Sequence, residues 1–186
     1  IENEHVPAPA HLMPLSCGML ELGLLRGMQP HGFRQELCLE TGECTVTATP
    51  TRVGMTWGLS TSPVEVRIWL HPTGNVLCVE CSSEGDCDVD WRYTTERRHE
   101  EGDPRYEVHE GVGIADYPVR EGIGYRASVT AAEEGVLDVS ASDHGLGGSL
   151  RFGGAGGTSR LVLRMESGPE DDDSPAERGA AARKTI

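Results

Sequence analysis

The chain has 186 residues, 37% of them hydrophobic, and a formal net charge of -14. This length suits one domain with terminal tails, and the 24 Gly and 11 Pro residues favour many turns and few long helices. The negative charge excludes nucleic acid and anionic membranes as primary partners, because both would repel this surface, and no apolar run reaches the roughly 18 residues that a membrane-spanning helix needs.

Composition along the chain predicts the domain organisation. Residues 1–14 contain three prolines and no periodic pattern, so we expect an extended arm. Residues 15–166 are expected to form a single domain. Residues 167–186 consist mainly of Gly, Pro, Ala and charged residues. Such a segment buries too little apolar surface to offset the entropy of ordering, so we expect a disordered acidic tail.

Within the domain, short segments alternate apolar and polar residues, as half-buried strands do. Residues 64–70 show this most clearly, and turn residues then lead to a second strand over residues 76–81. Gly42 supplies the positive φ for a hairpin between residues 33–39 and 44–48. Turn signals recur about every eight to twelve residues, which favours an all-β fold, an antiparallel β-sandwich. Further strands are predicted over residues 15–28, 89–94, 106–108, 112–117, 123–130, 136–141, 149–152 and 160–165.

An even number of cysteines in a small chain predicts three disulfides and an oxidising compartment, with the connectivity left open. On a regular strand Cys78 and Cys81 point to opposite faces, so we expect them not to bond each other. A zinc site at Cys44, Cys78, Cys81 and Cys87 is disfavoured, because no second Cys-x-x-Cys pair exists. We therefore predict no metal and assign all six cysteines to disulfides: Cys17, Cys38, Cys44, Cys78, Cys81 and Cys87.

No catalytic motif is recognisable. Ser142, Asp143 and His144 are adjacent, and adjacent residues rarely converge as a triad, so a glycine-rich turn is the better interpretation. The glycines of residues 153–157 are followed by neither lysine nor a helix, which argues against a phosphate loop and favours a flexible hairpin tip. We expect a protein that is not an enzyme and needs no cofactor.

The acidic segment from Glu80 to Glu121 holds the strongest binding signal, with thirteen Asp or Glu against five Arg. Asp86, Asp88 and Asp90 occupy alternate positions, so on a strand they would share one face and attract Arg and Lys side chains of a partner. The alternative is a solvated face that only serves solubility. Aromatic anchors next to carboxylates are typical of binding hot spots. The predicted partner-binding residues are Glu84, Asp86, Asp88, Asp90, Trp91 and Tyr93, with Glu100, Glu101 and Asp103 in a flanking loop.

In style the chain resembles the chemokine- and cytokine-binding proteins that poxviruses secrete. The resemblance is carried by the segment Cys17-Gly-Met-Leu-Glu-Leu-Gly, by the strand Val64–Ile68 and by the acidic run from Glu80 to Asp116. The arginine-rich, lysine-poor composition suits a GC-rich, parapoxvirus-like genome. The resemblance implies a β-sandwich whose exposed acidic sheet and loops hold the basic surface of a chemokine.

Together these observations predict a secreted, extracellular viral protein that sequesters a basic soluble chemokine or cytokine and so serves immune evasion. Long-range attraction by the acidic face would speed association. The alternative is an ectodomain fragment of a viral envelope protein or of a cell-surface adhesion glycoprotein. Neither function involves nucleic acid or insertion into a membrane.

Overall fold

The computed structural model describes residues 18–23, 28–52, 62–72, 74–95, 103–118, 124–133, 136–153 and 157–168. The predicted arm and nearly all of the predicted tail lie outside these ranges. The described residues contain no helix, and therefore none that could cross a membrane. Their strands are β1 (Met19–Gly23), β2 (Met28–Leu37), β3 (Cys44–Arg52), β4 (Val64–Leu70), β5 (Val76–Ser83), β6 (Cys87–Thr94), β7 (Arg105–His109), β8 (Val112–Pro118), β9 (Gly124–Ala131), β10 (Ser140–Ser142), β11 (Gly145–Phe152) and β12 (Thr158–Gly168).

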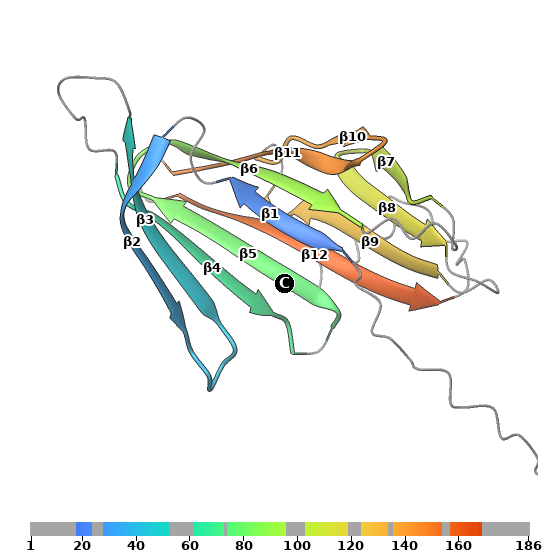
Figure 1. Ribbon diagram of the computed structural model, residues 1–186, viewed down its shortest axis with the longest axis horizontal. Helices are drawn as coiled ribbons and strands as arrows, with labels where there is room; N and C mark the ends of the chain where they lie inside the picture. The colour runs from blue at the N-terminus through green and yellow to red at the C-terminus, as the bar shows by residue number, and fades with distance from the viewer. Residues whose placement is uncertain are drawn as a thin grey trace, which may run out of the picture.

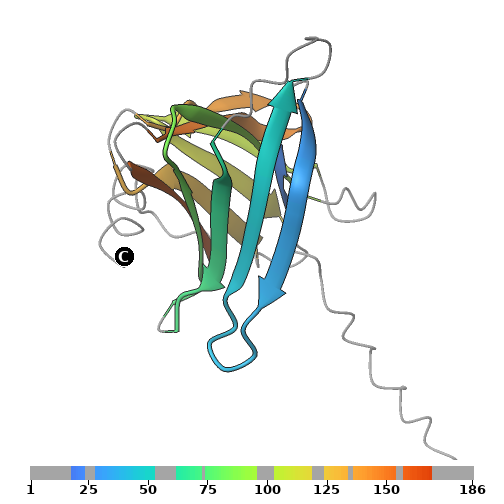
Figure 2. The ribbon, with the colours of Figure 1, turned by 90° about the vertical axis from the view of Figure 1, so that its left-hand side faces the viewer.

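The strands form two sheets that pack face to face (Figure 1). The large sheet has eight strands in the order β2-β3-β4-β5-β12-β9-β8-β7, and the small sheet has four in the order β1-β6-β11-β10. Every pair of neighbouring strands is antiparallel. The predicted antiparallel β-sandwich is confirmed. The large sheet is curved, and its β2–β3 hairpin extends beyond the small sheet (Figure 2).

The core lies between the two sheets and follows from the alternation seen in the sequence. The inner face of the large sheet contributes Val66, Val79 and Leu161, and that of the small sheet contributes Trp91 and Leu150; all five are buried. Such a core supplies most of the hydrophobic stabilisation, at about 25 cal/mol for each Å² of apolar area that is removed from water.

Strand β5 is buried on both of its faces. Cys81 belongs to the main core, whereas Cys78 packs on the opposite face of the large sheet with Val76, Val162 and the half-buried Trp69. The prediction that Cys78 and Cys81 point to opposite faces is therefore confirmed. A strand that is buried on both faces explains why apolar residues in this segment do not alternate cleanly with polar ones.

The region around β10 and β11 differs from prediction. The segment over residues 136–141 makes only one isolated bridge, between Leu137 and Leu150, before the short β10. The glycines that suggested a long turn belong to β11, and only Asp143 and His144 form the turn. Glycine is required at position 148, because a Cβ there would stand 1.8 Å from the backbone oxygen of Asp138. A close backbone contact, rather than a turn, thus accounts for glycine in this strand.

The prediction of a hairpin tip over residues 153–157 is also wrong. Strand β11 ends in the small sheet and β12 begins in the large sheet, so this segment crosses from one sheet to the other. Gly153 has a φ of 98° and its N–H donates a hydrogen bond to the carbonyl of Gly157. Glycine adopts that φ without steric cost, which lets the chain turn away from β11.

Candidate partner-binding face

Three carboxylates line the outer face of the small sheet. Asp88 and Asp90 belong to β6, and Asp86 directly precedes this strand. Val89 and the later odd-numbered residues of β6 face the core, so alternation turns the even-numbered ones outward. Asp86 and Asp88 are exposed and Asp90 is half-buried. We call Asp86, Asp88 and Asp90 the acidic stripe, and the exposed Glu84 lies in the bend just before it.

Trp91 and Tyr93 do not lie on this face. Their side chains are 2% and 1% exposed and pack in the core between the sheets. The indole Nε1 of Trp91 donates a hydrogen bond to the backbone oxygen of Asp138, 3.3 Å away. The prediction that these aromatic side chains anchor a partner beside the stripe is wrong, because residues 91 and 93 alternate with residues 88 and 90. Instead, they anchor β6 to the core between the two sheets.

The neighbouring strands surround the stripe with small residues. Asp90 lies opposite Gly23 of β1 and opposite Ser149 of β11. Gly147, also on β11, lies opposite Arg92. Residues without long side chains therefore flank the middle of the stripe.

Basic residues also lie on this face. Arg92 of β6 is exposed and lies opposite Glu21, while Arg151 lies opposite Asp88. Arg151 makes an ion pair with Asp138 at 3.8 Å, and Asp138 also accepts a hydrogen bond of 3.1 Å from the Ser149 hydroxyl. The face is thus mixed in charge, with the carboxylates concentrated along β6.

The predicted flanking loop is only partly described. Glu100 and Glu101 lie outside the described residues. Asp103 is exposed and comes just before β7, the edge strand of the large sheet. Thr95, which follows β6, donates its N–H to the hydroxyl of Tyr106 in β7 over 3.2 Å. This contact ties the end of β6 to the strand that follows Asp103.

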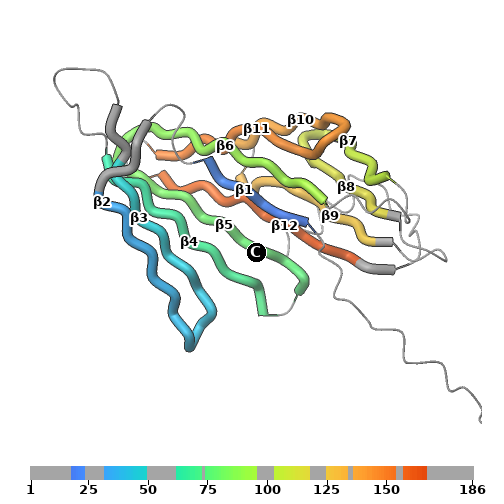
Figure 3. The backbone as a smooth tube through the Cα atoms, in the orientation of Figure 1, coloured from blue at the N-terminus to red at the C-terminus, as the bar shows by residue number. Residues whose placement is uncertain are grey.

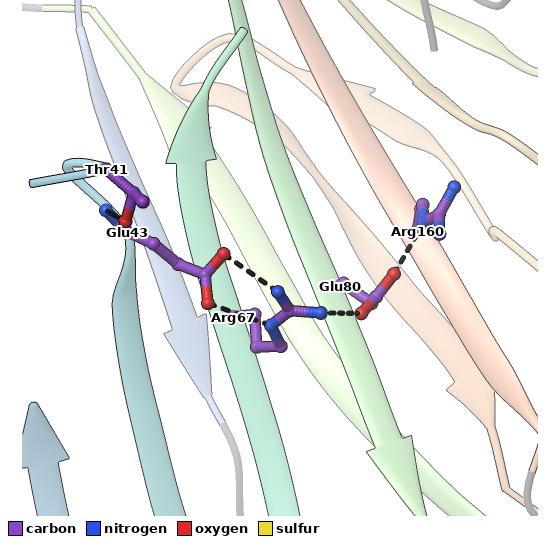
Figure 4. Close-up of polar contacts among 5 residues, drawn as sticks. All are labelled: Thr41, Glu43, Arg67, Glu80 and Arg160. Atoms are coloured by element: carbon purple, nitrogen blue, oxygen red, sulfur yellow. Dashed lines mark hydrogen bonds and ion pairs between the residues drawn. The ribbon is translucent and has the colours of Figure 1, made fainter. Parts of the chain in front are cut away.

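A second set of charges, which we did not predict from the sequence, lies on the outer face of the large sheet (Figure 4). Glu80 of β5 accepts hydrogen bonds from Arg67 of β4, at 3.1 Å, and from Arg160 of β12, at 2.6 Å. Arg67 also donates to both carboxylate oxygens of Glu43, at 3.0 and 2.8 Å. We call Glu43, Arg67, Glu80 and Arg160 the charge ladder.

The charge ladder follows the strand register. Arg67 lies directly opposite Glu80, which in turn lies directly opposite Arg160. Hydrogen bonds to Glu43, with further attraction from Glu43 and Glu80, raise the pKa of Arg67 despite partial burial. Arg67 also stacks over Trp69, with its guanidinium carbon 5.8 Å from the ring centroid. A sequence signal did exist, since pairing Leu70 with Leu77 across the predicted hairpin places Arg67 opposite Glu80.

The predicted disulfides are not seen among the described cysteines. Cys38, Cys44, Cys78, Cys81 and Cys87 are all free thiols, and Cys17 lies outside the described residues. The physical reason is geometric for Cys78 and Cys81, which lie on opposite faces of one sheet. Cys38 and Cys44 flank the β2–β3 turn without bonding across it.

The environments of the thiols differ. Burial raises the pKa of Cys78, and burial together with Glu80 raises the pKa of Cys81 to about 12. Hydrogen bonds from Thr41 lower the pKa of the exposed Cys38. The two buried thiols stay protonated near neutral pH and pack as small apolar groups. Within the described ranges, no three His, Cys, Asp or Glu residues come together in a way that could hold a metal ion.

Comparisons with known proteins bear on the fold alone. No protein family and no curated protein matches the sequence. Among solved structures the chain is similar to a protein assigned as a kojibiose phosphorylase from the human microbiome, with a TM-score of 0.54 and 9% sequence identity. The match covers 84% of this chain and 22% of that one, so this chain spans less than a quarter of the phosphorylase. The similarity supports the β-rich architecture.

Proposed function

We propose that the protein is a secreted binding protein that sequesters a basic soluble protein, a chemokine or another cytokine, on the outer face of its small sheet. The proposal assigns it no catalytic step. The observation that carries it is the exposure of Glu84, Asp86 and Asp88 in and beside the acidic stripe. Among the described residues no ion pair engages any of these three carboxylates. They are therefore available to Arg and Lys side chains from outside.

The geometry suits recognition of a basic surface in two ways. First, the stripe runs along β6, which lies between β1 and β11. The carboxylates therefore lie on an interior strand of the small sheet and not on its edge. Carboxylates that are spaced along one strand can accept charge-assisted hydrogen bonds from several basic side chains of a partner at once. Second, the net charge of -14 would steer a cationic protein toward the chain before contact.

An apolar anchor is still required, because charged contacts on an exposed face contribute more to association rate than to affinity. Trp91 and Tyr93 are buried, so the anchor must be another side chain. Met19 of β1 is 55% exposed, and with Glu21 it lies on the outer face of the small sheet. Its unbranched side chain adapts to irregular partner surfaces. Met19 lies opposite Thr94, beyond the Asp90 end of the acidic stripe, and we assign it as the apolar contact of this face.

The test is association with a panel of basic chemokines and cytokines, measured on immobilised protein at low and at physiological salt. The variant D88R/D90R reverses the middle of the stripe, and we expect its association rate to fall by about tenfold or more at low salt. Higher salt should narrow the difference from the unaltered chain, because screening weakens steering.

The matched control is E65R/E107R, which changes the net charge by the same amount at exposed positions on the large sheet. It should retain most of the association rate. Equal slowing by the two variants would assign the effect to net charge instead of to the stripe. Absence of binding by every basic protein in the panel at low salt would reject the proposal.

A further inference from the structure

Within the described residues, strand β2 is an edge of the large sheet and pairs only with β3 (Figure 3). Residues 32–37 of this strand are all exposed. An edge strand presents unpaired backbone groups that can add another strand, and proteins usually protect such edges. The ten-residue length of β2 is long for an edge.

Among the described residues, exposed apolar side chains lie next to this edge. Leu37 lies opposite Cys44, which lies opposite Ile68, and this row continues the core beyond the small sheet. The side chains of Phe33 and Leu37 are 58% and 59% exposed, and Leu70 at the end of β4 is 71% exposed. Apolar area therefore accompanies the open edge, and burying it would favour association.

The hydrogen-bond pattern shows which backbone groups face outward. The N–H of Cys38 donates to the carbonyl of Glu43, so residues 38 and 43 form a hydrogen-bonded pair. In an antiparallel ladder such pairs alternate with non-hydrogen-bonded ones, and Gln35 opposite Val46 and Leu37 opposite Cys44 belong to the second kind. The N–H and C=O groups of Gln35 and Leu37 therefore point away from β3, toward the free edge.

The sequence of this edge is complementary to itself. Phe33, Arg34, Gln35, Glu36 and Leu37 read apolar, positive, polar, negative, apolar. If two copies of β2 pair antiparallel about Gln35, Arg34 of each copy lies opposite Glu36 of the other, and Leu37 lies near Phe33, which adjoins the register shift between His31 and Arg34. We propose that a second copy of this chain occupies the β2 edge in this register, joining the two large sheets across a two-fold axis.

The same arrangement extends a row of polar contacts. Glu36 lies opposite Thr45, which lies opposite Arg67 of the charge ladder. Within one chain Arg34 already makes an ion pair with Glu36, and both side chains remain more than half exposed. In the dimer each of these groups gains an opposite charge from the other copy, and Gln35 exchanges two backbone hydrogen bonds with its symmetry mate. This dimer is independent of the proposed partner, whose site lies on the other sheet.

Sedimentation of the full chain from low micromolar to several hundred micromolar tests the proposal, in moderate salt so that the repulsion between two chains of net charge -14 is screened. We expect the mass to rise from that of the 20.0 kDa monomer to that of a dimer. The variants R34E and E36R each place like charges opposite one another across the two-fold axis. Each should raise the dissociation constant by about tenfold or more.

Two further samples make the register specific. The double variant R34E/E36R restores opposite charges and should dimerise like the unaltered chain. An equimolar mixture of R34E and E36R should form a heterodimer, because two acidic residues then face two basic ones. The control E65R reverses an exposed charge on the same outer face, away from the edge, and should leave the dimer intact.

Arg34 and Glu36 are more than half exposed, so their replacement should leave the fold intact, and circular dichroism of each variant checks for retained strand content. A chain that stays monomeric at every concentration would overturn the proposal. So would single variants that dimerise as tightly as the unaltered chain, or a mixture that fails to form the heterodimer.

Discussion

The outer faces of the two sheets differ in how their carboxylates are paired. On the large sheet, both carboxylate oxygens of Glu80 are held by arginines, and the side chain is only 11% exposed. On the small sheet, Asp86 and Asp88 are exposed and make no ion pair within the described residues. Charges that neutralise one another within the sheet hold strands together, whereas exposed carboxylates that make no ion pair within the described residues remain available to another molecule.

Strand register explains this difference. One row of the large sheet brings Arg67, Glu80 and Arg160 side by side from three strands. The corresponding row of the small sheet places Gly23 and Ser149 beside Asp90. Opposite charges directly across a strand pair contribute roughly 0.2–1 kcal/mol each, while glycine and serine offer no counter-charge. The outer charges of the large sheet therefore pair across three neighbouring strands, whereas Asp90 has no charged residue directly opposite it in register.

The largest effect on stability is expected from Trp91, which packs in the core on the side of β6 opposite the acidic stripe. W91A removes an indole that is 2% exposed in the core, and it should lower the free energy of unfolding by about 3–5 kcal/mol. Urea unfolding measures the loss. D88N/D90N alters the opposite side of the same strand and should change stability by less than about 0.5 kcal/mol. A large loss in D88N/D90N would mean that the stripe, like the charge ladder, serves the fold.

The next effect concerns the ladder itself. E80A leaves Arg160 without its carboxylate and Arg67 with Glu43 alone, so we expect a loss of about 1–2 kcal/mol. This figure is below that of a fully buried pair because Arg67 and Arg160 are 41% and 39% exposed. Thermal unfolding of E80A against E65A, an exposed glutamate of the neighbouring row on the same face, measures the difference. Equal stability of E80A and E65A would contradict a structural role for the ladder.

Much of this architecture could be predicted from local patterns. Val64–Leu70 alternates so regularly that its bounds as a strand were predicted correctly, and Gly42, with a φ of 71°, does form the predicted β2–β3 turn. Such signals depend only on neighbouring residues. The exposure of Asp86 and Asp88 on one face follows from the same two-residue period.

Features that depend on contacts between distant segments were not predictable in this way. Gly148 lies in a strand because the backbone of Asp138 passes 1.8 Å from where its Cβ would be, a contact that no local pattern reveals. The cysteine count suggested disulfides, but bonding needs proximity, and Cys78 and Cys81 face opposite sides of the sheet. The position of Trp91 was mispredicted although alternation contained the answer, since residue 91 cannot share a face with residue 90.

The smallest expected effect is a pH dependence of stability that comes from the buried Cys81 thiol, on the inner face of the large sheet. Burial and the nearby Glu80 raise the pKa of Cys81 from 9.0 to about 12, so the folded protein keeps this proton at pH values where the unfolded chain loses it. Unfolding then releases a proton, and stability must fall as pH rises above about 9, by at most about 1.4 kcal/mol per pH unit for one thiol.

Urea unfolding at pH 8 and pH 10 measures this dependence, and it should be clearly smaller in C81A than in the unaltered chain, whatever stability the smaller side chain costs at both pH values. C38A alters an exposed thiol and should leave the alkaline loss in place. If C81A retained the full alkaline loss, the thiol would not be held in its protonated form by the core. Because Glu80 itself raises the pKa of Cys81, the single variant E80A should also weaken the pH dependence of stability. This result would link the outer charges of the large sheet to its buried interior.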